Sequence, residues 1–306
     1  MAELTPLAKE RKRIRQLVKQ DRQHRHKLGS FYTEAMTIIS NHLNQFYLKY
    51  ADETGLSLKQ TEAKVRQWDM DQFQATIKEL LKDRTPDDDL TNQIQQAYVE
   101  SQRNRRGTMV AIISAGVAVA TSEAKKYGKL VVHDEYVEGH EARSGNQPVQ
   151  VPDDVEQARD YQQRVQVHGE VAQSRMKETL NTGLRRGLSA RDMRVMTHVY
   201  PPKSKRIKGN LSSELNKMVT RTQGLLIDVA NKSNNQGQQK AYENQSVEYV
   251  YWLTENDSRV CDKCDKLIGI WPVKSAPYPG QDTHPGCRCQ LVPCDKEGNI
   301  QPGFIW

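Results

Sequence analysis

Four cysteines and one histidine near the C-terminal end of the chain have the types and the spacing of metal ligands. Cys261 and Cys264 form a C-x-x-C pair, and His284, Cys287 and Cys289 follow as H-x-x-C-x-C. A C-x-x-C turn directs two thiolates into one pocket, and the second group can supply the remaining corners of a tetrahedron. The pattern therefore predicts a structural zinc site, with five candidate ligands for four positions.

Disulfides or reduced, buried thiols are the alternative for these cysteines. Four of the five cysteines fall within residues 254–293, which we term the knuckle, whereas a disulfide scaffold would distribute its bridges over the fold. The fifth, Cys294, is expected to be a bystander. Arg288 lies between the last two candidate ligands and should face the opposite side of an extended segment. Because a closed four-ligand site leaves no position for water, the zinc is expected to serve folding and not catalysis.

The composition points to a helical protein with much exposed surface. The chain has 306 residues, enough for two domains, but only 36% are hydrophobic and 7% aromatic. With a mean hydropathy of −0.80, this is lean for one compact globule, so we expect a mainly α protein. Its architecture should be an elongated helical bundle followed by a small α+β C-terminal unit that carries the knuckle.

Charge and hydropathy set limits on the partners. The formal net charge of +7 favours phosphate backbones, acidic proteins or anionic lipids. No segment reaches the roughly 18–20 apolar residues of a membrane span, so we expect no stable span. The N-terminus lacks the apolar region of a signal peptide, which favours a reducing cytoplasm and zinc thiolates over disulfides.

Residues 1–128 are expected to form a helical region. Apolar periodicity predicts helices over 5–28 and 30–51, and a capping box at Ser57 opens a further helix. The most apolar run, 107–126, is rich in small residues and should be a tightly packed core helix.

Basic residues concentrate in the first of these helices. From Lys9 to Lys27 the chain carries nine lysines or arginines and two acids. Two interpretations explain this pattern equally well. One is a solvated helix, and the other is an arm that touches nucleic acid or an acidic partner. A second basic stretch, 203–208, lies in an expected loop. The candidate nucleic-acid-binding residues are Lys9, Arg11, Lys12, Arg13, Arg15, Lys19, Arg22, Lys203, Lys205, Arg206 and Lys208.

The remainder of the chain is predicted to be a linker followed by a second domain. Residues 129–152 are polar and punctuated by glycine and proline, which indicates a loop with at most a short strand at its start. Residues 153–306 should form a domain of helices that ends in the knuckle, with a polar turn at 234–240. Residues 247–253 alternate as a strand does, and 290–293 should return as its partner.

Four features in the C-terminal half occur in a familiar order. They are G-L-R-R-G-L-S at 183–189, V-T-R-T-Q at 219–223, Y-V-Y-W before T-E-N-D-S-R-V-C-D-K-C, and H-P-G-C-R-C-Q-L-V-P. Together they resemble the phage head morphogenesis family, the Mu F-like minor head proteins of tailed bacteriophages, over roughly residues 150 to 295. The chain departs from that family at Gln223, where a glutamate is usual.

The resemblance implies a structural role without enzymatic activity. It implies a minor capsid protein of the virion that associates with the portal protein and the major capsid or scaffold protein. Contact with double-stranded DNA would be nonspecific, during head assembly, packaging or ejection. The protein would lie in the capsid interior or at the portal vertex, and in the host cytoplasm during assembly.

Two other functions remain open at the level of sequence. One is a metal-dependent nuclease or hydrolase acting on DNA, although the chain has no H-E-x-x-H, H-N-H-like or P-loop pattern. The other is a zinc-containing DNA-binding regulator, although neither a helix-turn-helix nor a finger repeat is evident.

Overall fold

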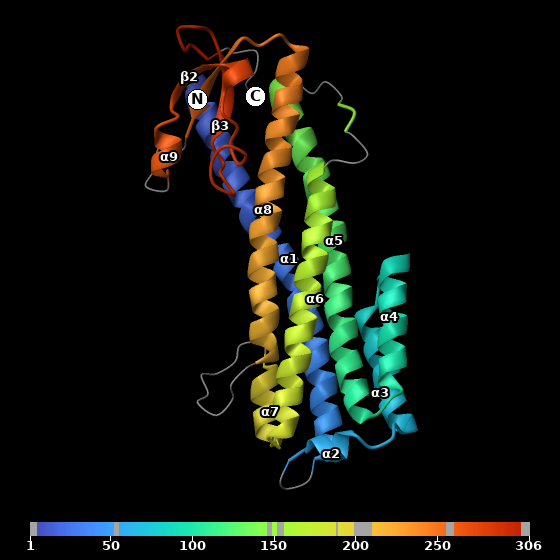
Figure 1. The fold of residues 1–306 in the computed structure, drawn as a ribbon. Helices are drawn as coiled ribbons and strands as arrows, with labels where there is room; N and C mark the ends of the chain where they lie inside the picture. The colour runs from blue at the N-terminus through green and yellow to red at the C-terminus, as the bar shows by residue number, and fades with distance from the viewer. Residues whose placement is uncertain are drawn as a thin grey trace. The chain divides into compact units, whose positions relative to one another are not determined.

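The structure, a computed structural model, describes residues 5–51, 55–145, 149–151, 156–187, 189–198, 210–254 and 260–300. The protein is 73% helical with a small antiparallel sheet near the C-terminus, which confirms the mainly α fold and the small α+β C-terminal unit (Figure 1). The helices are α1 (Pro6–Tyr50), α2 (Leu58–Thr61), α3 (Gln67–Leu80), α4 (Asp88–Ser101), α5 (Arg105–Ser144), α6 (Glu156–Arg185), α7 (Ala190–Thr197), α8 (Leu211–Asn244) and α9 (Asp262–Asp265). The strands are β1 (Tyr249–Leu253), β2 (Gly269–Pro272) and β3 (Gln290–Cys294), with a 3-10 turn at Val273–Ser275.

Two compact units divide the chain, and each is assembled from segments distant in the sequence. Unit 1 comprises Met1–Lys27, Tyr127–Gln163 and Gln223–Trp306, and unit 2 comprises Leu28–Lys126 and Arg164–Thr222. The four longest helices, α1, α5, α6 and α8, each contribute one stretch to either unit. This division differs from the predicted boundaries at residues 128 and 153, because continuous helices run through the positions where the units meet in the sequence.

The core of unit 2 is apolar and built around small residues of α5. Side chains of α5 from Met109 to Ala120 are buried, and a Cβ at Gly116 would collide with Ile39 of α1. One 18-residue window of α5 is long and apolar enough to cross a membrane, which corrects the expectation that no segment meets that test. Since 94% of that window is buried inside the protein, and core helices pass the same test, the core-helix interpretation is favoured.

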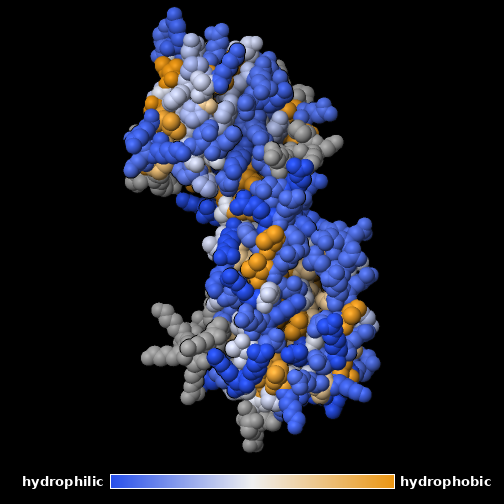
Figure 2. All heavy atoms as spheres, viewed as in Figure 1, coloured by the Kyte–Doolittle hydropathy of each residue, from blue (hydrophilic) through white to orange (hydrophobic). Residues whose placement is uncertain are grey.

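The visible surface is mainly hydrophilic. Figure 2 shows hydrophobic side chains as small, separate patches on the face in view. The exposed large hydrophobic residues of the described ranges are scattered along the sequence: Leu48, Tyr98, Val99, Leu130, Val167, Val171, Ile268 and Ile270. The hydrophobic residues, although few for a chain of this length, thus lie mainly in the interior.

Two segments predicted to be irregular are helical. The predicted loop at 129–152 is wrong over 129–144, which forms the last turns of α5, and the predicted turn at 234–240 lies inside α8. Both segments look like loops in the sequence because they carry many polar residues. Several of these polar side chains are buried and bonded to partners on other elements: Glu135, Arg143, Asn234, Asn235 and Gln238.

The predicted helices over 5–28 and 30–51 are one helix. Buried Leu28, Tyr32, Ala35 and Ile39 follow each other at steps of three or four residues, so the inner face of α1 continues past Gly29. The capping box at Ser57 is confirmed, since its side chain accepts from the backbone of Gln60.

Two glycines bring α5 and α8 into backbone contact within unit 1. A Cβ at Gly139 of α5 would collide with the carbonyl oxygen of Asn234, and a Cβ at Gly237 of α8 would collide with that of Tyr136. Neither obstacle is the end of a flexible side chain, so neither can move aside cheaply. The two helices can approach this closely only because both positions lack a side chain.

We expect Gly139→Ala to destabilise the protein by about 1–3 kcal/mol, because the added methyl group overpacks a backbone contact. Gly224→Ala is the control, since Gly224 is also a helical glycine, in α8, and a Cβ there has no neighbour within 4 Å. Alanine is the better helix former, so this control should be neutral or stabilising by up to about 1 kcal/mol. Urea unfolding followed by circular dichroism measures both; equal effects of the two changes would contradict the close approach.

The sheet has the order β2-β1-β3, and both pairings are antiparallel. Tyr249 is opposite Cys294 and Leu253 is opposite Gln290, so the predicted return of 290–293 beside the first strand is confirmed. β2 is an addition that the sequence did not predict. Trp252 of the central strand is fully buried and packs with Cys264 and Cys287, which joins the sheet to the cysteine cluster.

Candidate metal centre

The sheet positions the two halves of the cysteine cluster. Cys261 is the N-cap of α9, and its Sγ accepts a hydrogen bond from the backbone N–H of Cys264 at 3.4 Å. Cys287 and Cys289 directly precede β3. Gly286 has a φ of +70°, a value that favours glycine, and so allows the turn that the H-P-G-C motif makes before β3. β2 and β3 both begin at the end of the sheet where β1 ends, opposite Trp252 and Leu253, so the segments that carry the two cysteine pairs meet there.

The sulfur geometry fits a tetrahedral metal ion. The Sγ atoms of Cys264 and Cys287 lie 3.6 Å apart, and those of Cys264, Cys287 and Cys289 are all within 4.8 Å of one another. A tetrahedral ion with metal–sulfur distances of about 2.3 Å separates its thiolates by roughly 3.8 Å. All four knuckle cysteines are free thiols, which disagrees with the disulfide alternative.

His284 belongs to a second, overlapping group. Its ring nitrogen and the Sγ atoms of Cys261 and Cys264 are within 4.8 Å of one another. The ring is exposed, and its Nδ1 lies 3.0 Å from the carbonyl oxygen of Pro285. Cys264 is common to both groups, so all five predicted ligands gather around one buried sulfur. Cys294 is buried in β3 and belongs to neither group, as its expected bystander role requires.

Hydrogen bonds among the thiols shift their pKa values in opposite directions. A hydrogen bond from the Cys289 side chain lowers the pKa of Cys287 to about 5, and the same bond raises the pKa of Cys289. Burial raises the pKa of Cys264 to about 12. The backbone N–H of Cys264 lowers the pKa of the Cys261 thiol. The cluster therefore shares its protons unevenly, and a bound cation would displace those that remain.

Arg288 anchors the cluster to two helices of unit 1. Its guanidinium donates to Asp21 of α1 at 2.6 and 3.1 Å, and to Glu135 of α5 at 3.0 and 3.3 Å. Burial acts to lower the pKa of Arg288, but the carboxylates of Glu135 and Asp21 outweigh it and raise the pKa. The charge of Arg288 is thus neutralised by two carboxylates that come from the helices of unit 1.

Neither acid was predicted from the sequence. A signal was available for Asp21, since Glu10 and Asp21 are the two acids of the basic segment from Lys9 to Lys27 and lie 11 residues apart, about three helical turns. That spacing places both on the inner face with Ile14 and Leu17, where an acid needs a buried cation.

Glu10 starts a second buried polar chain. It forms a two-bond pair with Arg143 of α5 at 2.7 and 3.0 Å, and Arg143 donates in turn to Gln238 of α8. The Gln238 amide then donates to Gln290 of β3 at 3.0 Å. Burial acts to raise the pKa of Glu10, but Arg143 outweighs it and lowers the pKa, as a buried pair requires.

Two carboxamides of α8 hold the segment that carries the second ligand group. Asn231 donates to the carbonyl oxygen of Cys287, and Asn235 donates to that of Pro279 at 3.1 Å. Both asparagines are buried. Asn235 was predicted to lie in a turn, so its contact with Pro279 was not predicted from the sequence.

The predicted basic residues of α1 separate into two sets. Lys12, Arg15, Lys19 and Arg22 are exposed and follow each other at steps of three or four residues, within an arc of about 80°. We term these four the basic stripe. The three others, Lys9, Arg11 and Arg13, are half-buried.

Arg13 has a structural partner. It donates to Gln290 at 3.2 Å, and burial lowers its pKa to about 10. The segment that bears these residues is not a detached arm, because Ile14 and Leu17 on its inner face are buried. Lys203, Lys205, Arg206 and Lys208 lie outside the described residues.

Comparisons with protein-family models, with curated proteins and with solved structures found no match to this chain. The fold and the site define a mainly α-helical protein whose small antiparallel sheet carries a cysteine-rich cluster able to hold a metal ion.

We expect Cys264→Ala to abolish metal binding, because this sulfur is shared by both ligand groups. Cys294→Ala is the matched control, since it removes an equally buried thiol outside them. Elemental analysis of the purified proteins should find about one metal ion per chain in the wild type and the control, and none in Cys264→Ala. Metal-free wild-type protein that is unaffected by chelators would refute the site.

Proposed function

We propose that this chain is a structural minor capsid protein of a tailed bacteriophage that acts in head morphogenesis. The observation that carries the proposal is the meeting of its two most specific motifs. V-C-D-K-C and H-P-G-C-R-C, on which the resemblance to the Mu F-like minor head proteins depends, form one cluster. In the second motif, His284, Cys287 and Cys289 are candidate ligands, and the arginine between the two cysteines forms buried ion pairs.

The ion in this proposal is zinc, and its role is to fold the knuckle. Thiolate and imidazole donors suit zinc, and soft sulfur ligands disfavour magnesium and calcium. Five donors surround one centre, so four can close the coordination sphere and leave no position for a reacting water. This supports a structural protein over a metal-dependent nuclease.

The partners in this proposal are the portal protein, the major capsid or scaffold protein and double-stranded DNA. DNA would contact the basic stripe, whose first and last members are about 15 Å apart along α1. No base readout is needed for such contacts, because lysine and arginine recognise phosphates of any sequence. The chain would lie inside the capsid or at the portal vertex, and in the host cytoplasm before assembly.

The basic stripe gives a sharp test of DNA binding. Lys12→Glu, Lys19→Glu and Arg22→Glu in one variant should weaken binding to random duplex DNA at least about tenfold at low salt. The slope of log affinity against log salt should become shallower by about 2–3, because about three phosphate contacts are lost. Fluorescence anisotropy over a salt series measures both quantities.

The control for this variant keeps the same change in net charge. Lys64→Glu, Lys78→Glu and Lys82→Glu reverse three exposed lysines of unit 2, which does not contain the stripe. Equal loss of affinity in both variants would mean that only net charge matters. Wild-type binding that does not depend on salt would contradict phosphate contact altogether.

The virion role has its own test. Particles of the phage that encodes the chain should contain it in few copies, as mass spectrometry of purified virions can determine. Disruption of the gene should reduce the yield of infectious, DNA-filled heads while the major capsid protein is still made. Normal particles that lack the chain would overturn the proposal.

A further inference from the structure

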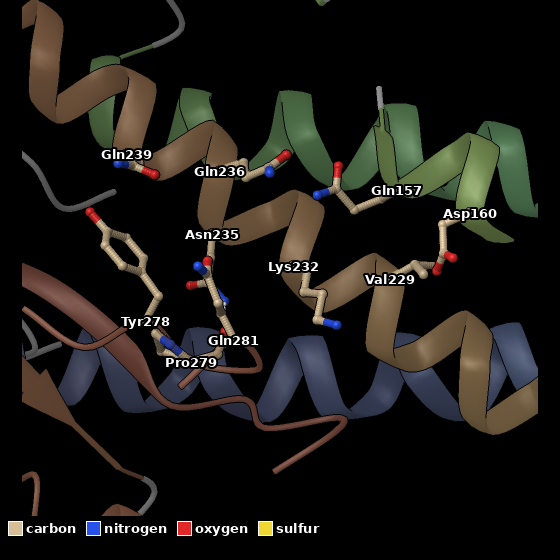
Figure 3. Close-up of a pocket in the computed structure, with 10 residues that line it drawn as sticks. All are labelled: Gln157, Asp160, Val229, Lys232, Asn235, Gln236, Gln239, Tyr278, Pro279 and Gln281. Carbon is tan, nitrogen blue, oxygen red and sulfur yellow. Dashed lines mark hydrogen bonds between the residues drawn. The ribbon is translucent and has the colours of Figure 1, made fainter. Parts of the chain in front are cut away.

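A polar pocket in unit 1 lies apart from the cysteine cluster. It has a volume of about 310 Å³ and lies between the start of α6, the second half of α8 and the segment around Tyr278 (Figure 3). Such a volume is at the lower end of those of small-molecule sites. Neither the metal centre nor the basic stripe uses it.

Carboxamide side chains dominate the lining. Gln236 and Gln239 project from adjacent turns of α8 and are half-buried, and Gln157 of α6 extends toward Gln236 (Figure 3). The Oε1 atom of Gln157 is buried without a hydrogen-bond partner among the described residues. Buried polar atoms are normally bonded, so an unmet acceptor at the wall of a pocket indicates a missing donor.

The charges of the lining exclude anionic ligands. Lys232 and Asp160 contribute one positive and one negative charge, and the Lys232 ammonium is already paired with Asp228 at 3.0 Å. A phosphate or carboxylate would find no uncommitted cation among the described residues of the lining. The ligand that suits the pocket is therefore neutral and rich in hydrogen-bonding groups.

The pocket wall is held in place before any ligand arrives. Asn235, itself buried, fixes the carbonyl of Pro279, and the backbone N–H of Tyr278 donates to Asp282 at 2.7 Å. Gly280 donates its N–H to the Thr283 hydroxyl at 2.8 Å. These bonds hold the backbone of the segment that carries Tyr278, so little backbone ordering is needed on binding.

We propose that this pocket binds a neutral saccharide unit. A carboxamide presents an acceptor beside two donors, and vicinal sugar hydroxyls, each a donor and an acceptor, match it. Tyr278 belongs to the lining, and the flat apolar face of an aromatic ring suits the C–H face of a sugar ring. A nucleobase would gain most from stacking on aromatic side chains, and Tyr278 is the one aromatic residue in the described lining. The inference does not depend on the virion role.

Saturation-transfer difference NMR on the full chain tests the proposal. The probes are glucose, galactose, N-acetylglucosamine and maltose, with adenosine and a blocked neutral dipeptide amide as non-saccharide comparisons. At least one saccharide should give signals at millimolar concentration, and titration should give its affinity. The double variant Gln236→Ala and Gln239→Ala should weaken that affinity about tenfold or more, because two carboxamide contacts are lost.

Two further variants separate binding from folding. Gln96→Ala removes an exposed glutamine of α4 and should leave saccharide binding unchanged. Tyr278→Phe should retain most of the affinity, whereas Tyr278→Ala should lose it, since the ring face is the contact. The circular dichroism spectra and melting temperatures of all variants must match the wild type for the comparison to hold.

Three outcomes would overturn the assignment. They are no signal from any saccharide, equal binding by the wild type and the double glutamine variant, and tighter binding of adenosine or the dipeptide amide than of every sugar. If the glutamine variant fails to fold, Tyr278→Ala compared with Tyr278→Phe still decides the matter.

Discussion

A buried arginine connects the cysteine cluster to the helices of unit 1. Arg288 lies between two candidate metal ligands, and its guanidinium is neutralised by Asp21 of α1 and Glu135 of α5. Removing one member of such a group leaves a buried charge unpaired, which typically costs about 3–5 kcal/mol. The backbone that holds Cys287 and Cys289 is therefore tied to α1 and α5 through the side chain between them.

The interiors of the two units follow different principles. Unit 2 packs small apolar residues of α5 closely, as at Gly116 beside Ile39. Unit 1 instead joins its helices and its sheet through buried ions and carboxamides, including Glu10, Arg143 and Gln238. Buried polar networks of this kind favour one arrangement, because another arrangement would leave more of their groups unbonded. This explains how a chain with little hydrophobic content can position its C-terminal sheet.

Three features of the structure have different chemistry: the cysteine cluster, the basic stripe and the carboxamide pocket. The cysteine cluster has the donors of a closed structural site, which favours a folding role for the ion. The basic stripe is a row of exposed cations, and the proposed DNA contact would use it without base recognition. The carboxamide pocket has a different chemistry, neutral and polar, and so indicates a ligand class that neither of the others would bind.

The sequence by itself determined the features that depend on near neighbours. Ser57 was recognisable as a helix cap, and the spacing of Cys261 and Cys264 was enough to predict a shared centre, because a few residues suffice to set each geometry. The pairing of β1 with β3 was predicted from the alternation of residues 247–253 and from the expected return of 290–293 beside them.

Only the tertiary structure decided where buried polar residues belong. Residues 129–144 and 234–240 looked like loops since their polar side chains had no visible partners, and the structure supplies those partners from afar. Asp21 and Arg288 are separated by 267 positions, and Glu135 and Arg288 by 153. Local patterns carry no information on such pairs, because a charge becomes acceptable inside a protein only when a distant segment neutralises it.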